Sequence, residues 1–128
     1  MRMPPGFNTV TPYFFVEDAA GFLGFLVHGL DGEEILRHLD GVRIANAQVR
    51  LGTSTVMVSE ASARFPAMPG SYYLYVANAD AAMARAVAAG AEPVMSVADM
   101  PYGDRQGGVR DAWGNLWWIS ERLVEGPY

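Results

Sequence analysis

Two short stretches of similar sequence decide the fold: TPYFFV at Thr11–Val16 and SYYLYV at Ser71–Val76. Both are rich in aromatic and β-branched residues, a composition typical of β-strands. When the chain is aligned with itself at an offset of sixty residues, identical residues coincide at Tyr13 and Tyr73, Val16 and Val76, Ala19 and Ala79, and Val27 and Val87. A repeat of this length indicates that the chain contains two copies of one supersecondary module.

A helix is predicted directly after each of these strands. The side chains of Asp18 and Asn78 suit the position before a helix, where they accept hydrogen bonds from the unpaired amides of the first turn. Residues with the i, i+3, i+4, i+7 spacing of one helix face then follow at Phe22, Phe25, Leu26 and Gly29, and again at Met83, Ala86, Val87 and Gly90. We expect Gly29 and Gly90 to end the helices in the left-handed conformation that glycine tolerates.

Three further strands are predicted in each copy. In the first they are Glu33–Leu39, Arg43–Leu51 and Ser54–Val58, with a hairpin turn at Asp40-Gly41. In the second they are Glu92–Val97, Gln106–Asp111 and Leu116–Glu121, with a loop over Ala98–Arg105. The chain is thus expected to be a single α+β domain, with module one at about 9–58, a linker at 59–70 and module two at about 71–122.

Composition limits the classes of function. A hydrophobic content of 51% and a charged content of 18% suit one globular domain of 128 residues. The net charge is −5 and all nine cationic residues are arginines, so no basic surface is left for nucleic acid. The absence of cysteine excludes disulfides, thiolate nucleophiles and cysteine metal sites. The longest apolar run, Ala19–Val27, is too short to span a membrane, and we expect a soluble, cytoplasmic protein without a membrane partner.

One face of each sheet is expected to lack a helix, because a single helix per module covers only the other face. Alternation along Arg43–Leu51 places Ala45, Ala47, Val49 and Leu51 under the helix, and Ile44, Asn46, Gln48 and Arg50 on the uncovered face. The same alternation places three further sets of residues on the uncovered face: Thr11, Tyr13 and Phe15; Ser71, Tyr73 and Tyr75; and Leu116, Trp118 and Ser120. The last set is preferred to its alternative, Asn115, Trp117 and Ile119. Two such faces opposite one another would enclose a cup lined with aromatic rings and amides.

Two motifs in the second copy carry a family resemblance. Tyr102–Arg105, which reads YGDR, resembles the W-G-D-R loop of PhnB-like proteins, and Asp111–Ile119, which reads DAWGNLWWI, resembles a D-P-x-G-x-x-W/E-x-I ending. On these motifs the chain is identified as a member of the vicinal oxygen chelate (glyoxalase, bleomycin resistance and dioxygenase) superfamily, in its PhnB-like branch. It departs from that branch at Tyr102, where tryptophan is usual, and at Ala112, where proline is usual.

The resemblance implies paired βαβββ modules, often completed by a homodimer, and a divalent metal ion held by His, Glu or Gln. Carried onto this sequence, the metal positions are Thr11, Asn46 or Gln48, Ser71, and Trp118. None of these residues is His, Asp or Glu, and divalent ions need several carboxylate or imidazole donors. We therefore expect neither a metal ion nor any other cofactor.

The residues expected to bind a ligand share the uncovered faces or the loops beside them. They are Tyr13, Phe15, Asn46, Gln48, Arg50, Tyr73, Tyr75, Tyr102, Arg105, Trp113 and Trp118. Each has a structural alternative: the aromatic residues fill the core, the amides bond to neighbouring backbone, Arg50 lies in solvent, and Arg105 pairs with Asp104 to fix a loop. No catalytic residue is assigned, because the chain lacks Cys, Lys and G-x-S-x-G, and Glu60 is the only carboxylate considered as a general base.

Three functions remain open. The first is a metal-independent protein, acting as a homodimer, that binds a small aromatic, hydrophobic or amphipathic molecule in the cup, as the bleomycin-resistance type does. The second is a metal-dependent lyase, isomerase or dioxygenase with an unusual ligand set such as Gln48, His38 and Glu34. The third is a catalytically silent relative that associates with other proteins. The first is the preferred hypothesis.

Overall fold

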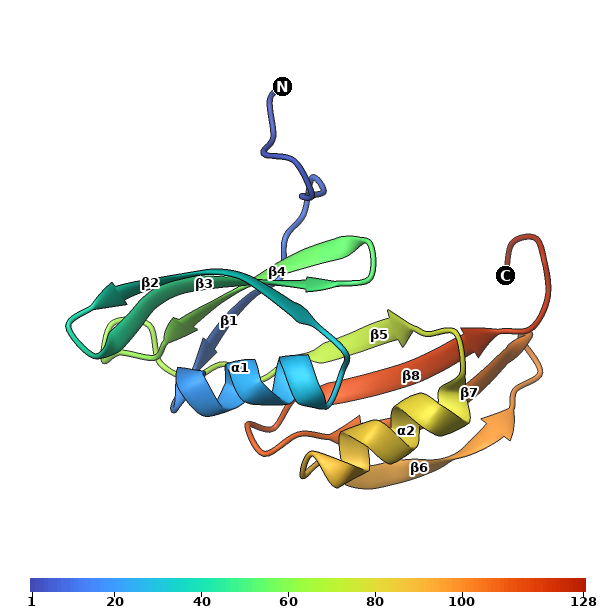
Figure 1. Ribbon diagram of the computed structural model, residues 1–128. Helices are drawn as coiled ribbons and strands as arrows, with labels where there is room; N and C mark the ends of the chain where they lie inside the picture. The colour runs from blue at the N-terminus through green and yellow to red at the C-terminus, as the bar shows by residue number, and fades with distance from the viewer. The chain divides into compact units, whose positions relative to one another are not determined.

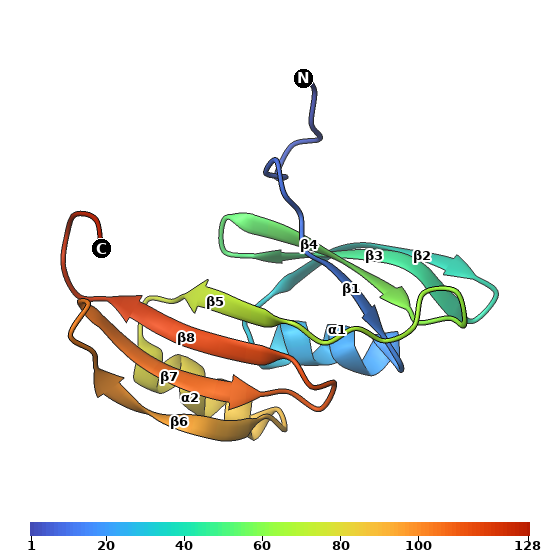
Figure 2. The same ribbon diagram turned by 180° about the vertical axis from the view of Figure 1, so that it is seen from behind.

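The computed structural model describes all 128 residues, and the chain divides into two compact units, 1–69 and 70–128. Each unit contains four strands and one helix, in the order strand, helix, strand, strand, strand (Figures 1 and 2). The predicted α+β fold of two βαβββ modules is therefore confirmed. Each helix has ten residues, and neither has the length and hydrophobicity that a membrane span requires.

The first unit is a sheet in the order β1-β4-β3-β2 with one helix against it (Figure 1). Its elements are β1 Tyr13–Val16, α1 Ala19–His28, β2 Glu33–Asp40, β3 Arg43–Leu51 and β4 Ser54–Glu60. β1 runs parallel to β4, and the other neighbours are antiparallel. β1, the first strand of the module, thus forms one edge of the sheet, beside β4, the last strand of the same module.

The second unit repeats this topology in the order β5-β8-β7-β6. Its elements are β5 Ser71–Tyr75, α2 Ala79–Ala88, β6 Glu92–Asp99, β7 Asp104–Arg110 and β8 Leu116–Arg122. β5 is parallel to β8. Asp104 and Arg105 lie in β7, and the loop before β7 covers only residues 100–103, so the predicted loop was too long because the strands on both sides extend into it.

The core of each unit lies between the helix and one sheet face. In the first unit Phe14, Phe22 and Val49 are almost completely buried, and the rings of Phe14 and Phe22 lie 5.0 Å apart. In the second unit Trp117 and Ile119 of β8 are buried to a similar degree. The alternation that assigned Trp117 to the core and Trp118 to the other face is therefore correct.

Both predicted helix starts are present, and each has a second cap that the sequence did not indicate. The Asp18 and Asn78 side chains accept from the amides of Gly21 and Ala81, respectively. The carboxylate of Glu60, at the end of β4, accepts from the amides of Asp18 (3.0 Å) and Ala19 (2.9 Å). Glu121 of β8 accepts in the same way from Ala79 at 2.9 Å. A carboxylate on the last strand of each module thus neutralises the positive end of that module's helix.

One of the two predicted glycine ends is wrong. Gly90 has a φ of 107°, which suits glycine, but Gly29 has a φ of −87° in the right-handed region. The amide of Gly29 donates to the carbonyl of Phe25 at 2.7 Å, so this residue continues the helical turn. The end of α1 therefore needs no left-handed residue at position 29.

Two bulges change the predicted faces of β2 and β3. Leu39 pairs with Ile44 and His38 pairs with Asn46, so Ala45 is an extra residue on β3. As a result Ile44 is buried, whereas alternation predicted Ala45 for the core and Ile44 for the uncovered face. Ile35 is likewise an extra residue on β2, because Glu34 pairs with Val49 and Leu36 with Gln48. Glu34 therefore shares the helix side with Val49, whereas His38 pairs with Asn46 on the other face.

Candidate functional site

The face of each sheet that carries no helix is called here the helix-free face. In the first unit it is formed by Tyr13 and Phe15 of β1, Met57 and Ser59 of β4, and Asn46, Gln48 and Arg50 of β3. In the second it is formed by Ser71, Tyr73 and Tyr75 of β5, Leu116, Trp118, Ser120 and Arg122 of β8, and Asp104, Gln106 and Gly108 of β7. Aromatic rings and hydrogen-bonding groups predominate on both faces.

On the first unit, Tyr13 organises the helix-free face. Its ring stacks on Phe15 at 4.8 Å, and Phe15 stacks in turn on Phe65 at 5.7 Å. The Asn46 amide donates to the Tyr13 hydroxyl at 3.1 Å, and the Ser59 hydroxyl donates to the Ala45 carbonyl at 2.7 Å. The 2.6 Å contact between the Tyr13 and Ser59 hydroxyls therefore has Tyr13 as its donor. Of the two predicted amides, Asn46 is engaged in this network.

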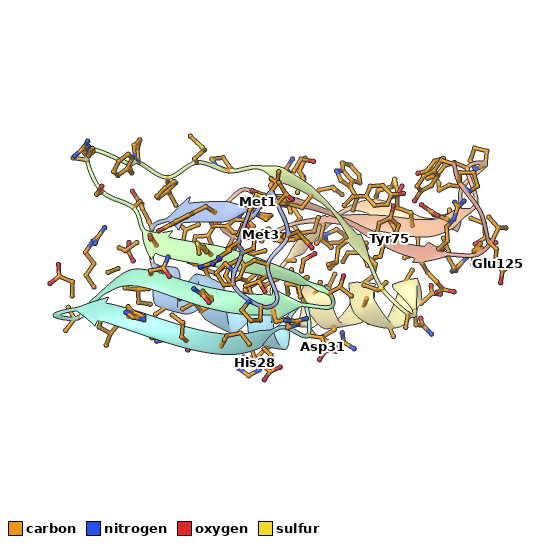
Figure 3. The ribbon with its side chains drawn as sticks, turned by 90° about the horizontal axis from the view of Figure 1, so that it is seen from above. Met1, Met3, His28, Asp31, Tyr75 and Glu125 are labelled. Atoms are coloured by element: carbon orange, nitrogen blue, oxygen red, sulfur yellow. The ribbon has the colours of Figure 1, made fainter.

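The segment before β1 passes over the Arg50 end of the same face. The Thr55 hydroxyl donates to the Gly6 carbonyl at 2.7 Å, and a Cβ added at Gly6 would lie 2.5 Å from an Arg50 guanidinium nitrogen. Gly6 also has a φ of 86°, which disfavours other residues. In the view from above, Met1 and Met3 project over this sheet (Figure 3), but Figure 1 shows that the N-terminal segment rises away from it, and Met1 is almost fully exposed. Arg50 is thus partly covered by its own chain at Gly6.

On the second unit, Trp118 forms the flat centre of the helix-free face. It lies opposite Tyr73 on β5 and Gly108 on β7, and its indole N–H donates to the Ser71 hydroxyl at 2.9 Å. A Cβ at Gly108 would lie 2.9 Å from the indole, so glycine lets the ring lie directly on the strand. The adjacent Gly107 admits Met83 of α2 on the opposite face in the same way.

A buried carboxylate stands at the end of this face. Asp104 is completely buried and accepts from the hydroxyls of Tyr73 (2.5 Å) and Tyr128 (2.6 Å) and from the Arg122 guanidinium (3.0 Å). Burial raises the pKa of the Asp104 carboxyl, but the hydrogen bonds from Tyr128, Tyr73 and Arg122 outweigh it, and the pKa lies below its ordinary value. The hydrogen bond to Asp104 raises the pKa of the Tyr128 hydroxyl strongly. Both groups thus keep their ordinary protonation states at neutral pH.

Tyr102 belongs to a neighbouring network of hydrogen-bonded side chains. Its hydroxyl donates to the side-chain oxygen of Gln106, and the Gln106 amide donates to the Ser120 hydroxyl at 2.7 Å. Burial raises the pKa of the Tyr102 hydroxyl, as does the negative charge of Asp104. The structure therefore brings Tyr73, Tyr75, Tyr102 and Trp118 together on one unit.

Two other predicted ligand residues lie elsewhere. Arg105 lies on the helix side of β7, where it forms ion pairs with Asp80 of α2 and Asp99 of β6, both at 2.9 Å. The hydrogen bond to Asp80 raises the pKa of Arg105 and lowers that of Asp80. Arg105 therefore links α2 to the sheet and does not lie on the helix-free face, and its contact with a ligand stays a prediction.

Trp113 lies in the turn between β7 and β8. Its amide donates to Asp111, whose buried carboxylate also accepts from the amide and side chain of Asn115 and from the indole of Trp117 at 2.8 Å. Asp111 therefore caps this turn. The DxxGN portion of the family-like ending thus shapes the turn and anchors the core face of β8.

The metal-binding side chains that the superfamily uses are not present at the corresponding positions of this chain. The positions carried over from the resemblance are Thr11, Asn46 or Gln48, Ser71 and Trp118, and an indole has no lone pair for a metal ion. The chain contains no group of three or more His, Asp or Glu side chains placed to hold a metal. The alternative set also fails to converge, because Glu34 lies on the helix side and bonds to Arg37, whereas His38 and Gln48 lie on the other face.

Glu60 caps a helix, because both oxygens of its carboxylate accept from the amides of Asp18 and Ala19 at the start of α1. The sequence did not predict the cluster formed by Asp104, Arg122 and Tyr128. Starting the predicted third strand of the second module at Asp104 would have indicated it, because Asp104 pairs directly with Arg122 across β7 and β8. The contribution of Tyr128 had no sequence signal, because it lies in an aperiodic segment.

The fold and these motifs define a class of protein. Residues 6–119 match the Glyoxalase/Bleomycin resistance protein/Dioxygenase superfamily, and the chain belongs to that superfamily.

Among its relatives is an uncharacterized protein of Mycobacterium bovis, 30% identical, with the match covering 91% of this chain and 84% of the relative. Among solved structures, TioX from Micromonospora sp. ML1 is 25% identical, with a TM-score of 0.75 and coverage of 94% of this chain and all of that one. TnmS3 from a Streptomyces species, an antibiotic binding protein, has the same fold at 19% identity, with a TM-score of 0.69 and coverage of 90% and 97%.

Proposed function

We propose that this protein binds a small aromatic or amphipathic molecule on its helix-free faces, without a metal ion and without catalysing a reaction. The observation that carries this proposal is the contrast on the second unit. Trp118, Tyr73 and Tyr75 present rings and hydrogen-bonding groups, yet no carboxylate or imidazole set accompanies them that could hold a metal. Large rings with a few polar groups are what ligand sites use for flat molecules.

Exposure of these rings supports the proposal. Tyr13 is 41% exposed, Tyr73 43% and Tyr75 58%, although they stand on strands whose other face is buried. Exposed aromatic groups on adjacent positions are characteristic of surfaces that meet a ligand or a partner. TnmS3, which has the same fold, is an antibiotic binding protein, and this supports a binding function for the present chain.

The finer assignments belong to the same proposal. The Tyr102–Arg105 motif supports placement in the PhnB-like branch, and the superfamily's common assembly supports a homodimer. A cytoplasmic location agrees with a chain that has no cysteine. Light scattering during size-exclusion chromatography tests the dimer: a mass of one chain would remove that part of the proposal.

A tryptophan fluorescence screen against aromatic antibiotics and other hydrophobic molecules, with EDTA present, tests the function. Saturable quenching is the expected result. Trp118→Phe should abolish most of the quenching, and the matched variant Trp117→Phe should retain it, because Trp117 is buried under α2. Binding that requires added Ni²⁺, Zn²⁺, Mn²⁺ or Fe²⁺ would contradict the proposal and favour a metal-dependent enzyme.

A further inference from the structure

The segment after β8, Leu123–Tyr128, is called here the tail. It leaves the end of β8 and curls back on itself (Figure 2), so that the phenol of Tyr128 reaches the helix-free face of the second unit. Arg122 stabilises the curl by donating to the carbonyls of Gly126 and Pro127, both at 3.1 Å. Gly126 has a φ of 94°, which makes this turn possible.

Three polar groups bind the phenol of Tyr128, and its ring also lies 6.3 Å from that of Tyr102. Its hydroxyl donates to Asp104 at 2.6 Å and, since that bond uses its only hydrogen, it accepts from the hydroxyl of Tyr75 at 2.7 Å. The Arg122 guanidinium lies 4.3 Å from the centre of its ring. A phenol matches these three groups, because its hydroxyl donates to the acceptor and accepts from the donor, and its π face meets the cation.

We propose that Asp104, Tyr75 and Arg122 form a binding subsite for a phenolic hydroxyl, which Tyr128 occupies in the free protein and which a phenolic ligand takes over. This inference rests on the proposed function and specifies its ligand: an uncharged aromatic molecule with a free hydroxyl group on the ring.

The contacts of the tail favour exchange over a permanent structural role. Tyr128 is 67% exposed, and Leu123 and Val124 are 46% and 52% exposed, so little apolar surface holds the tail in place. Asp104, in contrast, is completely buried and keeps its bonds to Tyr73 and Arg122 when Tyr128 leaves. The departure of Tyr128 therefore leaves no unpaired buried charge, and an incoming phenol restores the contacts that were lost.

The charges of the subsite define what it rejects. A carboxylate or phosphate at the position of the Tyr128 hydroxyl would meet the Asp104 carboxylate, which the hydrogen bonds from its neighbours keep ionised. An aryl methyl ether cannot donate to Asp104, and an aliphatic alcohol offers no ring to Arg122. Phenols are the class that satisfies all three groups.

Fluorine NMR titrations with two matched probes, 4-fluorophenol and 4-fluoroanisole, test the inference. Tyr128→Ala empties the subsite, and we expect its dissociation constant for 4-fluorophenol to be at least about fivefold lower than that of the wild type. Tyr128→Phe, which loses only the hydroxyl, should also bind the phenol more tightly than the wild type. The control Glu125→Ala, in the same tail, should leave the dissociation constant unchanged, and 4-fluoroanisole should gain in none of the variants.

Two results would overturn the inference: no saturable binding of 4-fluorophenol to Tyr128→Ala, or an equal gain in affinity for 4-fluoroanisole. Equal gain would leave the proposed function standing, since aromatic molecules would still bind, whereas failure of the separate quenching screen would remove the function itself.

A second measurement uses the unaltered protein. With ring-labelled tyrosine, the Tyr128 signals should move toward those of an unstructured tyrosine as 4-fluorophenol saturates the site, and binding without such movement would contradict displacement. Asp104→Asn, after its fold is verified by circular dichroism, should weaken 4-fluorophenol binding in the Tyr128→Ala background at least about fivefold. Retained affinity in a folded Asp104→Asn protein would exclude Asp104 as the acceptor.

Discussion

The adjacent residues Trp117 and Trp118 have opposite roles, and replacing each with alanine should separate them. Trp117 is only 2% exposed, its ring lies 4.9 Å from that of Tyr72, and its indole donates to Asp111. Truncation of a buried tryptophan costs about 3–5 kcal/mol in unfolding free energy. Asp111 keeps its bonds to Trp113 and Asn115, so no large further cost is expected.

Trp118→Ala should cost only about 1 kcal/mol, because the ring lies on the helix-free face and its one hydrogen bond, to Ser71, is exposed. With an ordinary urea m-value of about 2 kcal/mol per molar, the midpoints of the two variants should differ by about 1–2 M. Urea denaturation followed by far-ultraviolet circular dichroism measures this difference. Ligand binding should show the reverse order, with Trp118→Ala the more impaired variant. Equal destabilisation, or a greater loss for Trp118→Ala, would refute the assignment of faces.

Three further perturbations test the structure. Glu60→Ala and Glu121→Ala each remove a carboxylate from a helix start and should lower the unfolding free energy by about 1 kcal/mol in thermal or urea denaturation, whereas Glu125→Ala should have no effect. The pKa of Asp104 is lowered in the folded protein, so its contribution to the unfolding free energy is complete above its unfolded pKa of about 4 and is lost as the pH falls further. Melting scans over this pH range should show the loss in the wild type and less of it in Asp104→Asn. Identical pH profiles of the two proteins would argue against the cluster. Gly108→Ala should tilt Trp118, changing its fluorescence and weakening ligand binding, whereas Gly107→Ala should affect stability alone, because its Cβ would meet Met83.

Periodicity predicted those parts of the fold where strand alternation is unbroken. Trp118 was placed correctly because β8 pairs with both neighbours without a register shift. Alternation fails at Ile44 because a single-residue bulge at Ala45 reverses it, and a second bulge at Ile35 has the same effect on β2. Bulges depend on the hydrogen-bond register between strands, which the composition of one strand does not specify.

The candidate site was predicted in part for a related reason. The aromatic residues on β5 and β8 followed from alternation, but the sequence places Asp104 in a loop beside Arg105, because β7 is expected to begin two residues later. Adjacent residues in a strand point to opposite faces, so inclusion of Asp104 in β7 separates it from Arg105 and pairs it with Arg122. Tyr128 was unpredictable, since its position depends on a tail whose path is set by contacts with Arg122.

The central claim, binding without a metal ion, is tested most directly by one titration, performed first without metal and then with each of four metal ions added. The aromatic molecule that quenches most strongly in the screen is titrated once with excess EDTA and once with an equivalent of Ni²⁺, Zn²⁺, Mn²⁺ or Fe²⁺ in turn, and plasma mass spectrometry records the metal content of the protein. We predict dissociation constants that agree within about twofold and less than about 0.1 equivalent of any metal in the EDTA sample. A dissociation constant at least about tenfold lower with one metal, together with nearly one bound equivalent of it, would contradict the account.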